Sequence, residues 1–150
     1  MIITTAQLKK IIPFTKESVI NEVVPLLNDV FIKYEINTSL RVQHFLFPFI
    51  HESGGFRYNE EIASGAAYEG RKDLGNIIPG DGKRFKGRGF IQLTGRNNYS
   101  RYSKYIKVDV VAKPELVAIT YKADVAGWFW TIEKNLNRFA DADDVTTITK

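Results

Sequence analysis

Cysteine is absent from this sequence of 150 residues, and histidine occurs only twice. The lack of cysteine excludes disulfides, thiolate nucleophiles and zinc sites with Cys ligands. Because His44 and His51 are the only imidazoles, a histidine-rich metal site is not expected either. We therefore predict a protein that needs no metal and no other cofactor.

Long hydrophobic runs are also missing. The longest apolar run, Phe45 to Ile50, is far too short to span a bilayer. The first twelve residues do not form the hydrophobic region of a secretory signal, since threonine, glutamine and lysine interrupt them. We expect a protein made in the cytoplasm without a signal peptide of its own, and without a membrane partner.

The remaining composition is that of an ordinary globular chain, with 44% hydrophobic and 25% charged residues. No internal repeat, low-complexity tract or linker interrupts it, so residues 1–150 are expected to form one domain, and a monomer is the default expectation. Aromatic residues make up 13% of the chain, which indicates a dense core or a cleft that stacks flat ligands. The net charge of +4 suits any polyanionic partner without choosing among them.

Helical signals dominate the sequence. Thr4 and Gln7 have the spacing of a capping box that opens a short helix ending before Pro13. Further helices are expected at about 15–24 (capped by Thr15), 25–34 (begun by Pro25), 39–52, 97–105, 114–119 and 121–137, with a last one begun by Asp143 or Asp144. Pro48 inside the 39–52 helix predicts a kink, and Gly54-Gly55 can end that helix.

The middle of the chain is rich in glycine and charge. Five glycines fall within residues 75–89, so this part is expected to be loop or turn. A short helix is expected near 64–71, and 90–94 alternates weakly enough to suggest one short strand. The predicted fold class is mainly α, with at most a short β element.

Two carboxylates stand in contrasting settings. Glu52 falls in the last turn of the predicted 39–52 helix, where free carbonyls disfavour a negative charge. Phe45 and Phe49 share its side of the helix, so its stem is expected to face apolar surface, and both effects favour the protonated acid. Glu61 follows nine residues later in a polar segment beyond the Gly54-Gly55 turn, where we expect it to stay ionised.

Such a pair suits the hydrolysis of a glycosidic bond. One carboxyl group protonates the leaving oxygen while the other activates water, and a separation of about 6.5–9.5 Å would give inversion at the anomeric carbon. Local physics does not separate Glu60 from Glu61 as the base, and a solvated surface pair is the plain alternative. His51 can hydrogen-bond substrate, or it can simply satisfy a backbone carbonyl.

The chain resembles the family 19 glycoside hydrolases, the plant-type chitinases and their small bacterial and phage relatives. The motifs that carry the resemblance are His51-Glu52-Ser53-Gly54-Gly55-Phe56, Tyr58-Asn59-Glu60-Glu61 and Gly87-Arg88-Gly89-Phe90-Ile91-Gln92-Leu93-Thr94-Gly95-Arg96-Asn97-Asn98-Tyr99. The similarity covers roughly residues 40–137. The stretch at 63–71 looks especially like phage and prophage endolysins.

The resemblance implies a lysozyme-like, two-lobed fold around a saccharide cleft. It places the general acid on Glu52, the general base on Glu61, and the hydroxyl that helps to hold the attacking water on Thr94. The predicted substrate-binding residues are His51, Arg88, Gln92, Asn98 and Tyr99. The neutral amides of Gln92 and Asn98 suit sugar hydroxyl and N-acetyl groups.

The sequence also departs from the family pattern. Phe47, Pro48 and Phe49 are bulkier than the residues expected there, so the catalytic helix is expected to be bent or repacked. The family normally continues with an Asn-Gly-Gly segment and a basic residue that closes the cleft. Both would fall after Lys150, so either the sequence is part of a longer chain or the active site is incomplete.

The predicted substrate is peptidoglycan, cut at β-1,4 bonds by an endolysin-like enzyme. Chitin oligomers are the second choice, and a non-catalytic module that binds wall saccharides is the third reading. The basic run at 83–89 also permits a nucleic-acid reading, but no nucleic-acid-binding fold accompanies it, so no nucleic-acid partner is predicted.

Overall fold

A computed structural model describes residues 2–148 of the chain. The helices are α1 (Thr5–Ile11), α2 (Glu17–Lys33), α3 (Ser39–Glu52), η1 (Ala66–Tyr68), η2 (Lys72–Leu74), α4 (Asp81–Arg84), α5 (Arg96–Ile106), α6 (Leu116–Ile119), α7 (Asp124–Trp128), η3 (Phe129–Glu133), α8 (Asn137–Asp141) and α9 (Val145–Ile148). Within the described residues, β pairing is limited to the isolated bridges Glu60–Arg88 and Arg88–Leu93. The prediction of a mainly α fold is confirmed.

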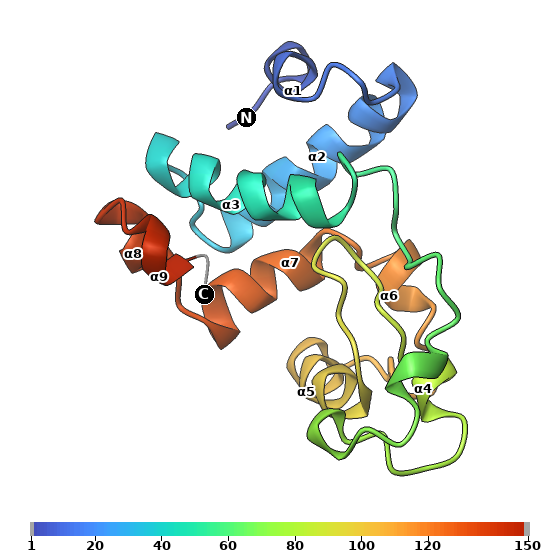
Figure 1. Ribbon diagram of the computed structural model, residues 1–150. Coiled ribbons are helices and arrows are strands. Elements are labelled where there is room, and N and C mark those ends of the chain that lie inside the picture. Colours follow the sequence, from blue (N-terminus) through green and yellow to red (C-terminus); the bar gives the residue numbers. More distant parts are fainter. Residues whose placement is uncertain (1, 149–150) are drawn as a thin grey trace.

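The helices form an upper and a lower group in Figure 1. The upper group holds α1, α2 and α3 together with α7, α8 and α9, while α4 and α5 lie below. The loop that follows α3 descends along one side to join the two groups. None of the helices in the part of the chain that the structure describes is long and apolar enough to cross a membrane.

Capping residues place the first and third helices as the sequence predicts. The Thr4 hydroxyl accepts the Gln7 amide at 3.1 Å, and the Gln7 side chain returns a bond to the Thr4 amide at 2.8 Å. Thr38 caps α3 by accepting the Arg41 amide at 3.2 Å. Helix α3 continues through Pro48 to Glu52 without interruption. The kink expected at Pro48 stays a prediction.

The prediction of two helices at 15–24 and 25–34 is wrong. One helix, α2, runs through Pro25, because this proline lies on the solvent side, where water can satisfy the carbonyl that it leaves without a donor. The helix begins after Lys16, which makes no side-chain cap. The expected cap, Thr15, is buried and donates its hydroxyl to the carbonyl of Gly55 at 2.9 Å.

Three other expectations need correction. Residues 90–94 form turns instead of a strand, since Gln92 takes a left-handed conformation with φ of 60°. A short helix, α4, interrupts the loop expected at 75–89. The helix expected at 121–137 is divided. Helix α7 continues into the π-helical turn η3, and residues 134–136 then separate η3 from α8 without helical structure.

The core joins helices from both ends of the chain. Phe45 packs edge-on against Phe31 and Trp130, with ring centroids 5.6 Å from each. Gly127 lets α7 approach α2 closely, because a Cβ there would lie 2.4 Å from the ring of Tyr34. Arg41 adds a polar tie between α3 and α8 through a two-point ion pair with Asp141. The C-terminal helices therefore hold α3, and Glu52 with it, in position.

Candidate active site

Glu52 is the last residue of α3, as predicted, and a tight turn follows it. The buried hydroxyl of Ser53 donates to the carbonyl of Phe49 at 2.6 Å and accepts the amide of Phe56 at 2.9 Å. Gly54 and Gly55 both take left-handed conformations, with φ of 61° and 72°. The Ser-Gly-Gly sequence thus reverses the chain directly after the carboxylate.

The turn also packs against the N-terminal part of the chain. A Cβ on Gly55 would lie 2.5 Å from the ring of Phe14 and 2.6 Å from the hydroxyl of Thr15. Thr15 hydrogen-bonds the carbonyl of this same glycine. Any larger residue at this position would push the turn, and the start of the following loop, away from α2.

The expectation that apolar surface surrounds the stem of Glu52 is wrong. Phe45 and Phe49 point into the core, where their rings lie 4.6 Å apart and pack on Trp130. Glu52 itself is exposed, as is the neighbouring His51. The difference arises because the helix ends at Glu52, so no further turn covers this side chain.

Glu61 is held on two sides. Its Oε1 accepts the amide of Gly87 at 2.7 Å, and its Oε2 accepts the hydroxyl of Tyr68 at 3.2 Å. Its backbone amide donates to the carbonyl of Gly87 at 2.9 Å. Partial burial and the charge of Glu61 raise the pKa of Tyr68, so this tyrosine remains a hydrogen-bond donor at neutral pH. The carboxylate is therefore fixed in orientation and half-buried.

Glu60 has a different environment from its neighbour. Its carboxylate lies 2.6 Å from Nζ of Lys86 and 3.7 Å from Nε of Arg88. The hydrogen bond from Lys86, assisted by the charge of Arg88, holds the pKa of Glu60 below its usual range. The two adjacent carboxylates thus have different partners: the carboxylate of Glu60 is ion-paired, whereas among the described residues the carboxylate of Glu61 accepts hydrogen bonds from the Tyr68 hydroxyl and the Gly87 amide.

Gly87 is the point where the predicted polar residues meet Glu61. A Cβ on Gly87 would lie 2.8 Å from Oε1 of Gln92 and 3.4 Å from the hydroxyl of Thr94. The backbone of Gly87 also makes two hydrogen bonds with Glu61, one to its carboxylate and one to its backbone amide. The fold therefore brings Glu61, Gln92 and Thr94 to one place, although more than 30 residues separate the first from the other two.

The polar side chains of this loop bond to the loop itself. The Thr94 hydroxyl donates to the carbonyl of Gln92 at 2.8 Å, and the Gln92 amide donates to the carbonyl of Gly89 at 3.1 Å. Asn98 donates to the carbonyl of Thr94 at 2.9 Å. These bonds fix the left-handed backbone of Gln92. Substrate contacts for Gln92 and Asn98 stay predictions.

Two predicted substrate-binding residues are buried beneath the loop. Tyr99 has no exposed surface, and its hydroxyl donates to the carbonyl of Lys86 at 2.6 Å. Arg88 is 7% exposed and donates to that hydroxyl at 3.2 Å and to the carbonyl of Arg84 at 2.7 Å. Burial raises the pKa of Tyr99. The prediction of direct substrate contact is wrong for Tyr99, and both residues support the 84–88 segment from inside.

Sequence reasoning missed Tyr68, Lys86 and Gly87. Tyr68 binds Glu61 from the stretch at 63–71, where an aromatic residue within a small polar loop was the available signal. Lys86 precedes Gly87 and forms an ion pair with Glu60. No sequence signal distinguished which glycine amide would reach Glu61, because that contact joins segments 26 residues apart.

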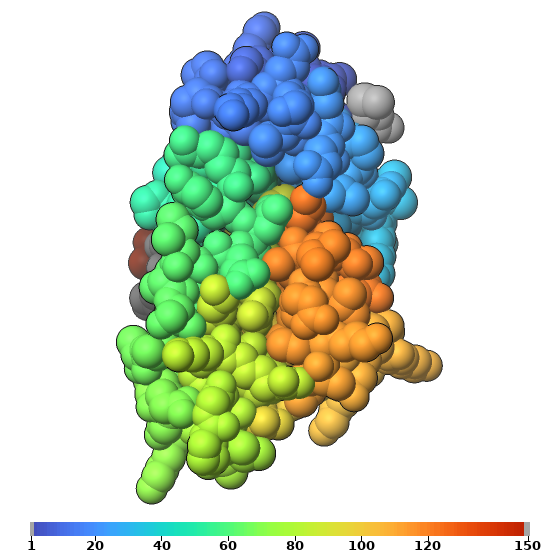
Figure 2. Space-filling view, turned by 90° about the vertical axis from the view of Figure 1, so that its right-hand side faces the viewer, coloured from blue at the N-terminus to red at the C-terminus, as the bar shows by residue number. Residues whose placement is uncertain are grey.

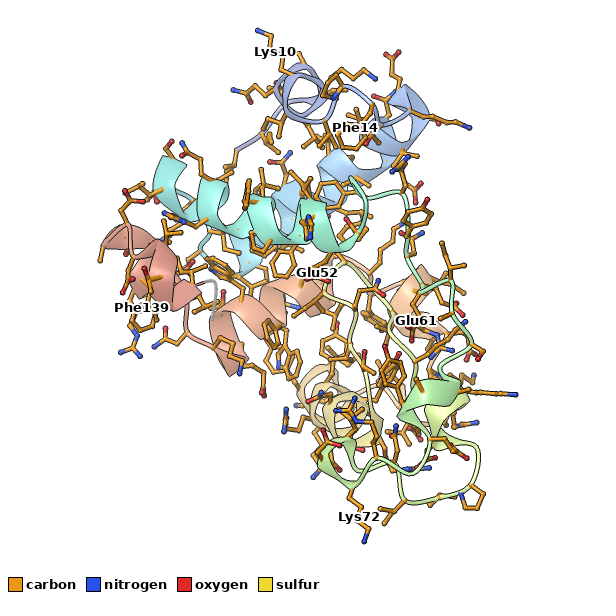
Figure 3. All side chains as sticks on the ribbon, in the orientation of Figure 1. Lys10, Phe14, Glu52, Glu61, Lys72 and Phe139 are labelled. Carbon is orange, nitrogen blue, oxygen red and sulfur yellow. The ribbon has the colours of Figure 1, made fainter. Side chains whose placement is uncertain are left out.

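The labelled carboxylates Glu52 and Glu61 lie at the end of α3 and on the descending loop (Figure 3). Figure 2 shows three segments side by side: this loop in green, residues 80–89 in yellow-green and the segment near α6 in orange. Backbone bonds from Gly89 to Asn59 at 2.7 Å and from Phe90 to Lys122 at 2.9 Å join these segments. The predicted separation of the two carboxyl groups stays a prediction.

Two cavities of the structure lie away from these carboxylates. One of about 960 Å³ lies between α1 and α3, and one of about 580 Å³ lies between α2, α5 and the start of α7. Neither is lined by Glu52 or Glu61. Among residues 2–148, no three His, Asp or Glu side chains are gathered as a metal ion would require.

Most cations of the basic run at 83–89 bond to other residues of the protein. Arg84 binds the carbonyls of Val111 and Ala112, Lys86 pairs with Glu60, and Arg88 is buried. Three of the four cations of the run are therefore engaged by other residues of the protein, and the absence of a nucleic-acid partner stays a prediction.

Comparison with known proteins agrees with the resemblance seen in the motifs. Residues 48–147 match the sequence family described as chitinase class I, glycoside hydrolase family 19. An endochitinase of Arabidopsis thaliana is 37% identical over 89 residues, which are 58% of this chain and 30% of that protein. A glycosyl hydrolase family 19 domain-containing protein of Haemophilus influenzae is 35% identical over 72 residues, 47% of this chain and 35% of that protein.

Solved structures show the same fold. Chitinase C from Streptomyces griseus superposes with a TM-score of 0.68 at 22% identity, over 87% of this chain and 66% of that one. A bacterial family 19 chitinase gives a TM-score of 0.66 at 20% identity, over 89% and 70%. The matched part of the chain spans about a third of the length of the Arabidopsis thaliana endochitinase and of the Haemophilus influenzae protein. The chain belongs to glycoside hydrolase family 19 and has the chitinase fold of that family.

Proposed function

We propose that the protein hydrolyses β-1,4-glycosidic bonds of bacterial peptidoglycan by inverting general acid/base catalysis. Glu52 protonates the leaving oxygen, and Glu61 removes a proton from the attacking water. The observation that carries the proposal is the arrangement at Gly87, where Glu61 is fixed by two donors beside Thr94 and Gln92. A carboxylate oriented by neutral donors keeps a free lone pair for water.

The same arrangement distinguishes Glu60 from Glu61 as candidates for the general base. Glu60 shares its charge with Lys86 and Arg88, which lowers its ability to take a proton. Glu61 has no such cation on its carboxylate in the part of the chain that the structure describes. This difference supports Glu61 as the proposed base, with Glu60 fixing the segment that carries it.

In the proposed reaction the sugar chain lies between the end of α3 and the 87–94 segment. Water approaches the anomeric carbon from the side of Glu61, with the Thr94 hydroxyl as a second hydrogen-bond partner. As the carbon–oxygen bond breaks, the proton of Glu52 passes to the departing oxygen and the water proton passes to Glu61. Product release and proton exchange with solvent restore both groups.

Peptidoglycan is proposed over chitin because the stretch at 63–71 is similar to phage and prophage endolysins. In this setting the protein would be made in the host cytoplasm and reach the wall through membrane lesions formed by another protein. Chitin is the second candidate, favoured by the names of the plant relatives, which are endochitinases.

A binding protein without turnover is the third candidate. A protein of Hevea brasiliensis named inactive chitinase-like protein 1 is 34% identical over 80 residues, 51% of this chain and 24% of that protein. Such a protein would bind the polysaccharide and release no products.

The deciding experiment exposes the protein to purified peptidoglycan and, separately, to N-acetylglucosamine oligomers, with products identified by mass spectrometry. Glu52→Gln and Glu61→Gln should each lower the rate by at least about 100-fold. Glu115→Gln, on an exposed carboxylate outside the site, should keep the wild-type rate. Cleavage of chitin oligomers alone would replace the proposed substrate, and binding without products from either would replace the proposed activity.

A further inference from the structure

The cavity of about 580 Å³ lies apart from the proposed catalytic groups, between α2, α5 and the segment that leads into α7. It has the size of an ordinary small-ligand site. The polar and aromatic residues that line it are Asp29, Lys33, Tyr105, Thr120, Tyr121 and Asp124. Figure 2 shows α2 in blue next to the orange segment that precedes α7 on this side of the molecule.

The floor of this cavity is a fixed polar network. Asp124 accepts hydrogen bonds from the hydroxyls of Tyr34 and Tyr102 and from Nζ of Lys33, the last at 2.7 Å. Tyr34 and Tyr102 are buried, and burial raises the pKa of each, so both stay donors. A carboxylate with three donors is already satisfied, and it holds the walls of the cavity in place instead of offering a charge to a ligand.

The rim carries polar groups that have no partner. In the described part of the chain, nothing hydrogen-bonds the carboxylate of Asp29 or the hydroxyls of Thr120 and Tyr121. The rings of Tyr105 and Tyr121 stand beside them, and both are packed from behind: Tyr121 against Tyr102 at 6.2 Å, and Tyr105 against Trp128 at 6.3 Å. Tyr105 is 38% exposed.

This combination suits a neutral sugar ring. The C–H face of a pyranose packs on a tyrosine ring because the face of the ring is partially negative. Sugar hydroxyls donate to a carboxylate and exchange hydrogen bonds with side-chain hydroxyls. A cationic ligand is less well matched, because the ammonium of Lys33 already lies 5.8 Å from the centre of the Tyr105 ring and pairs with Asp124. Within the described lining, Tyr121 is therefore the ring on which the sugar face would pack.

We infer that this cavity is a second saccharide-binding site, which holds a distant part of the same polysaccharide that the catalytic carboxylates act on. The inference rests on the proposed function for the identity of the polysaccharide. The site would keep the protein on a polymeric surface between cleavage events. It would add little to the cleavage of short soluble chains, because such a chain has no distant part for the second site to hold.

The test uses the full chain with Glu61→Gln, to prevent turnover, and a soluble peptidoglycan tetramer of alternating N-acetylglucosamine and N-acetylmuramic acid as the probe. Amide NMR shifts should change in two groups, one around 87–98 and one around residues 29, 105, 120 and 121. Adding Asp29→Asn with Thr120→Val should weaken the second group about fivefold or more and leave the first group unchanged. Glu115→Gln, on a nearby exposed carboxylate outside the cavity, is the matched control.

Activity gives an independent readout. Asp29→Asn with Thr120→Val should lower the hydrolysis of insoluble polymer about threefold to tenfold and change the hydrolysis of the soluble tetramer less than twofold. Shifts confined to 87–98 would overturn the inference and leave the proposed function standing. Shifts confined to the cavity would support the inference and overturn the proposed function, and no shifts in either group would overturn both.

Discussion

Gly87 and Glu61 exchange two hydrogen bonds: the Gly87 amide donates to Oε1 of the carboxylate at 2.7 Å, and the Glu61 amide donates to the Gly87 carbonyl at 2.9 Å. One bond sets the position of the backbone and the other sets the direction of the carboxylate. Because a side chain on residue 87 would meet Gln92 and Thr94, the lack of a side chain is what lets these groups come together.

Replacing this glycine should therefore disturb the site more than the fold. A Cβ at Gly87→Ala would lie 2.8 Å from the flexible end of Gln92, which can move aside. We expect kcat/KM on soluble oligomers to fall about tenfold, which corresponds to about 1.4 kcal/mol, with little change in the free energy of unfolding. Kinetics together with urea denaturation check this, and a large loss of stability with unchanged kcat/KM would contradict it.

The Tyr68 hydroxyl is expected to contribute through Glu61. Tyr68→Phe removes the 3.2 Å hydrogen bond to Oε2 and leaves the bond from Gly87 in place. A single lost hydrogen bond of about 0.5–1.5 kcal/mol should lower kcat about threefold to tenfold. Tyr58→Phe is the control, since that exposed hydroxyl has no bond to any described residue, and an equal effect of both changes would argue against the assigned role.

The ion pair of Asp81 and Arg96 should support the lower helices at neutral pH. Two hydrogen bonds of 2.8 Å join the side chains, and only 2% of the Asp81 side chain is exposed. Asp81→Asn should lower the free energy of unfolding by about 2–3 kcal/mol, less than for a fully buried pair because a quarter of the Arg96 side chain is exposed. Urea denaturation at pH 7 measures the loss.

The same pair predicts a pH dependence. Hydrogen bonding to Arg96 holds the pKa of Asp81 below its ordinary value of about 3.9. Its stabilisation is then complete above pH of about 4 and declines as the pH falls through the lowered pKa. The difference in stability between the wild type and Asp81→Asn should shrink in that acidic window. A difference that is constant down to pH of about 2 would show that the ion pair is not its source.

Gly127 is expected to be required for packing. In an open helix, Gly→Ala gains up to about 1 kcal/mol from helix propensity. Here a Cβ would lie 2.4 Å from Tyr34 and 2.6 Å from Val30, so overpacking should outweigh that gain and cost about 1–3 kcal/mol in total. Thermal and urea unfolding test this. Val30→Ala in the same chain should recover part of the loss, and a stabilised Gly127→Ala protein would refute the close approach of α7 and α2.

Local chemistry in the sequence determined much of the helical framework. Thr4 caps α1 as predicted, because such capping depends on residues three positions apart. Helix α3 begins and ends where the sequence predicts, with Thr38 as its cap and Glu52 as its last residue. Asp144 likewise accepts the amide of Thr147 at the start of α9. The continuous α2 was not predicted, because the tolerance of Pro25 depends on which side of the helix faces water.

The site was decided in part by the sequence and in part by the fold. Motifs alone pointed to Glu52, Glu61 and Thr94, since residue type and order carry that signal. Only the tertiary structure pairs Glu60 with Lys86, turns Tyr99 inward and leaves Glu52 exposed. These outcomes depend on contacts between segments that are far apart in the sequence. The free energy of a long-range ion pair or of a buried side chain depends on its spatial neighbours, and the local sequence does not specify which residues those are.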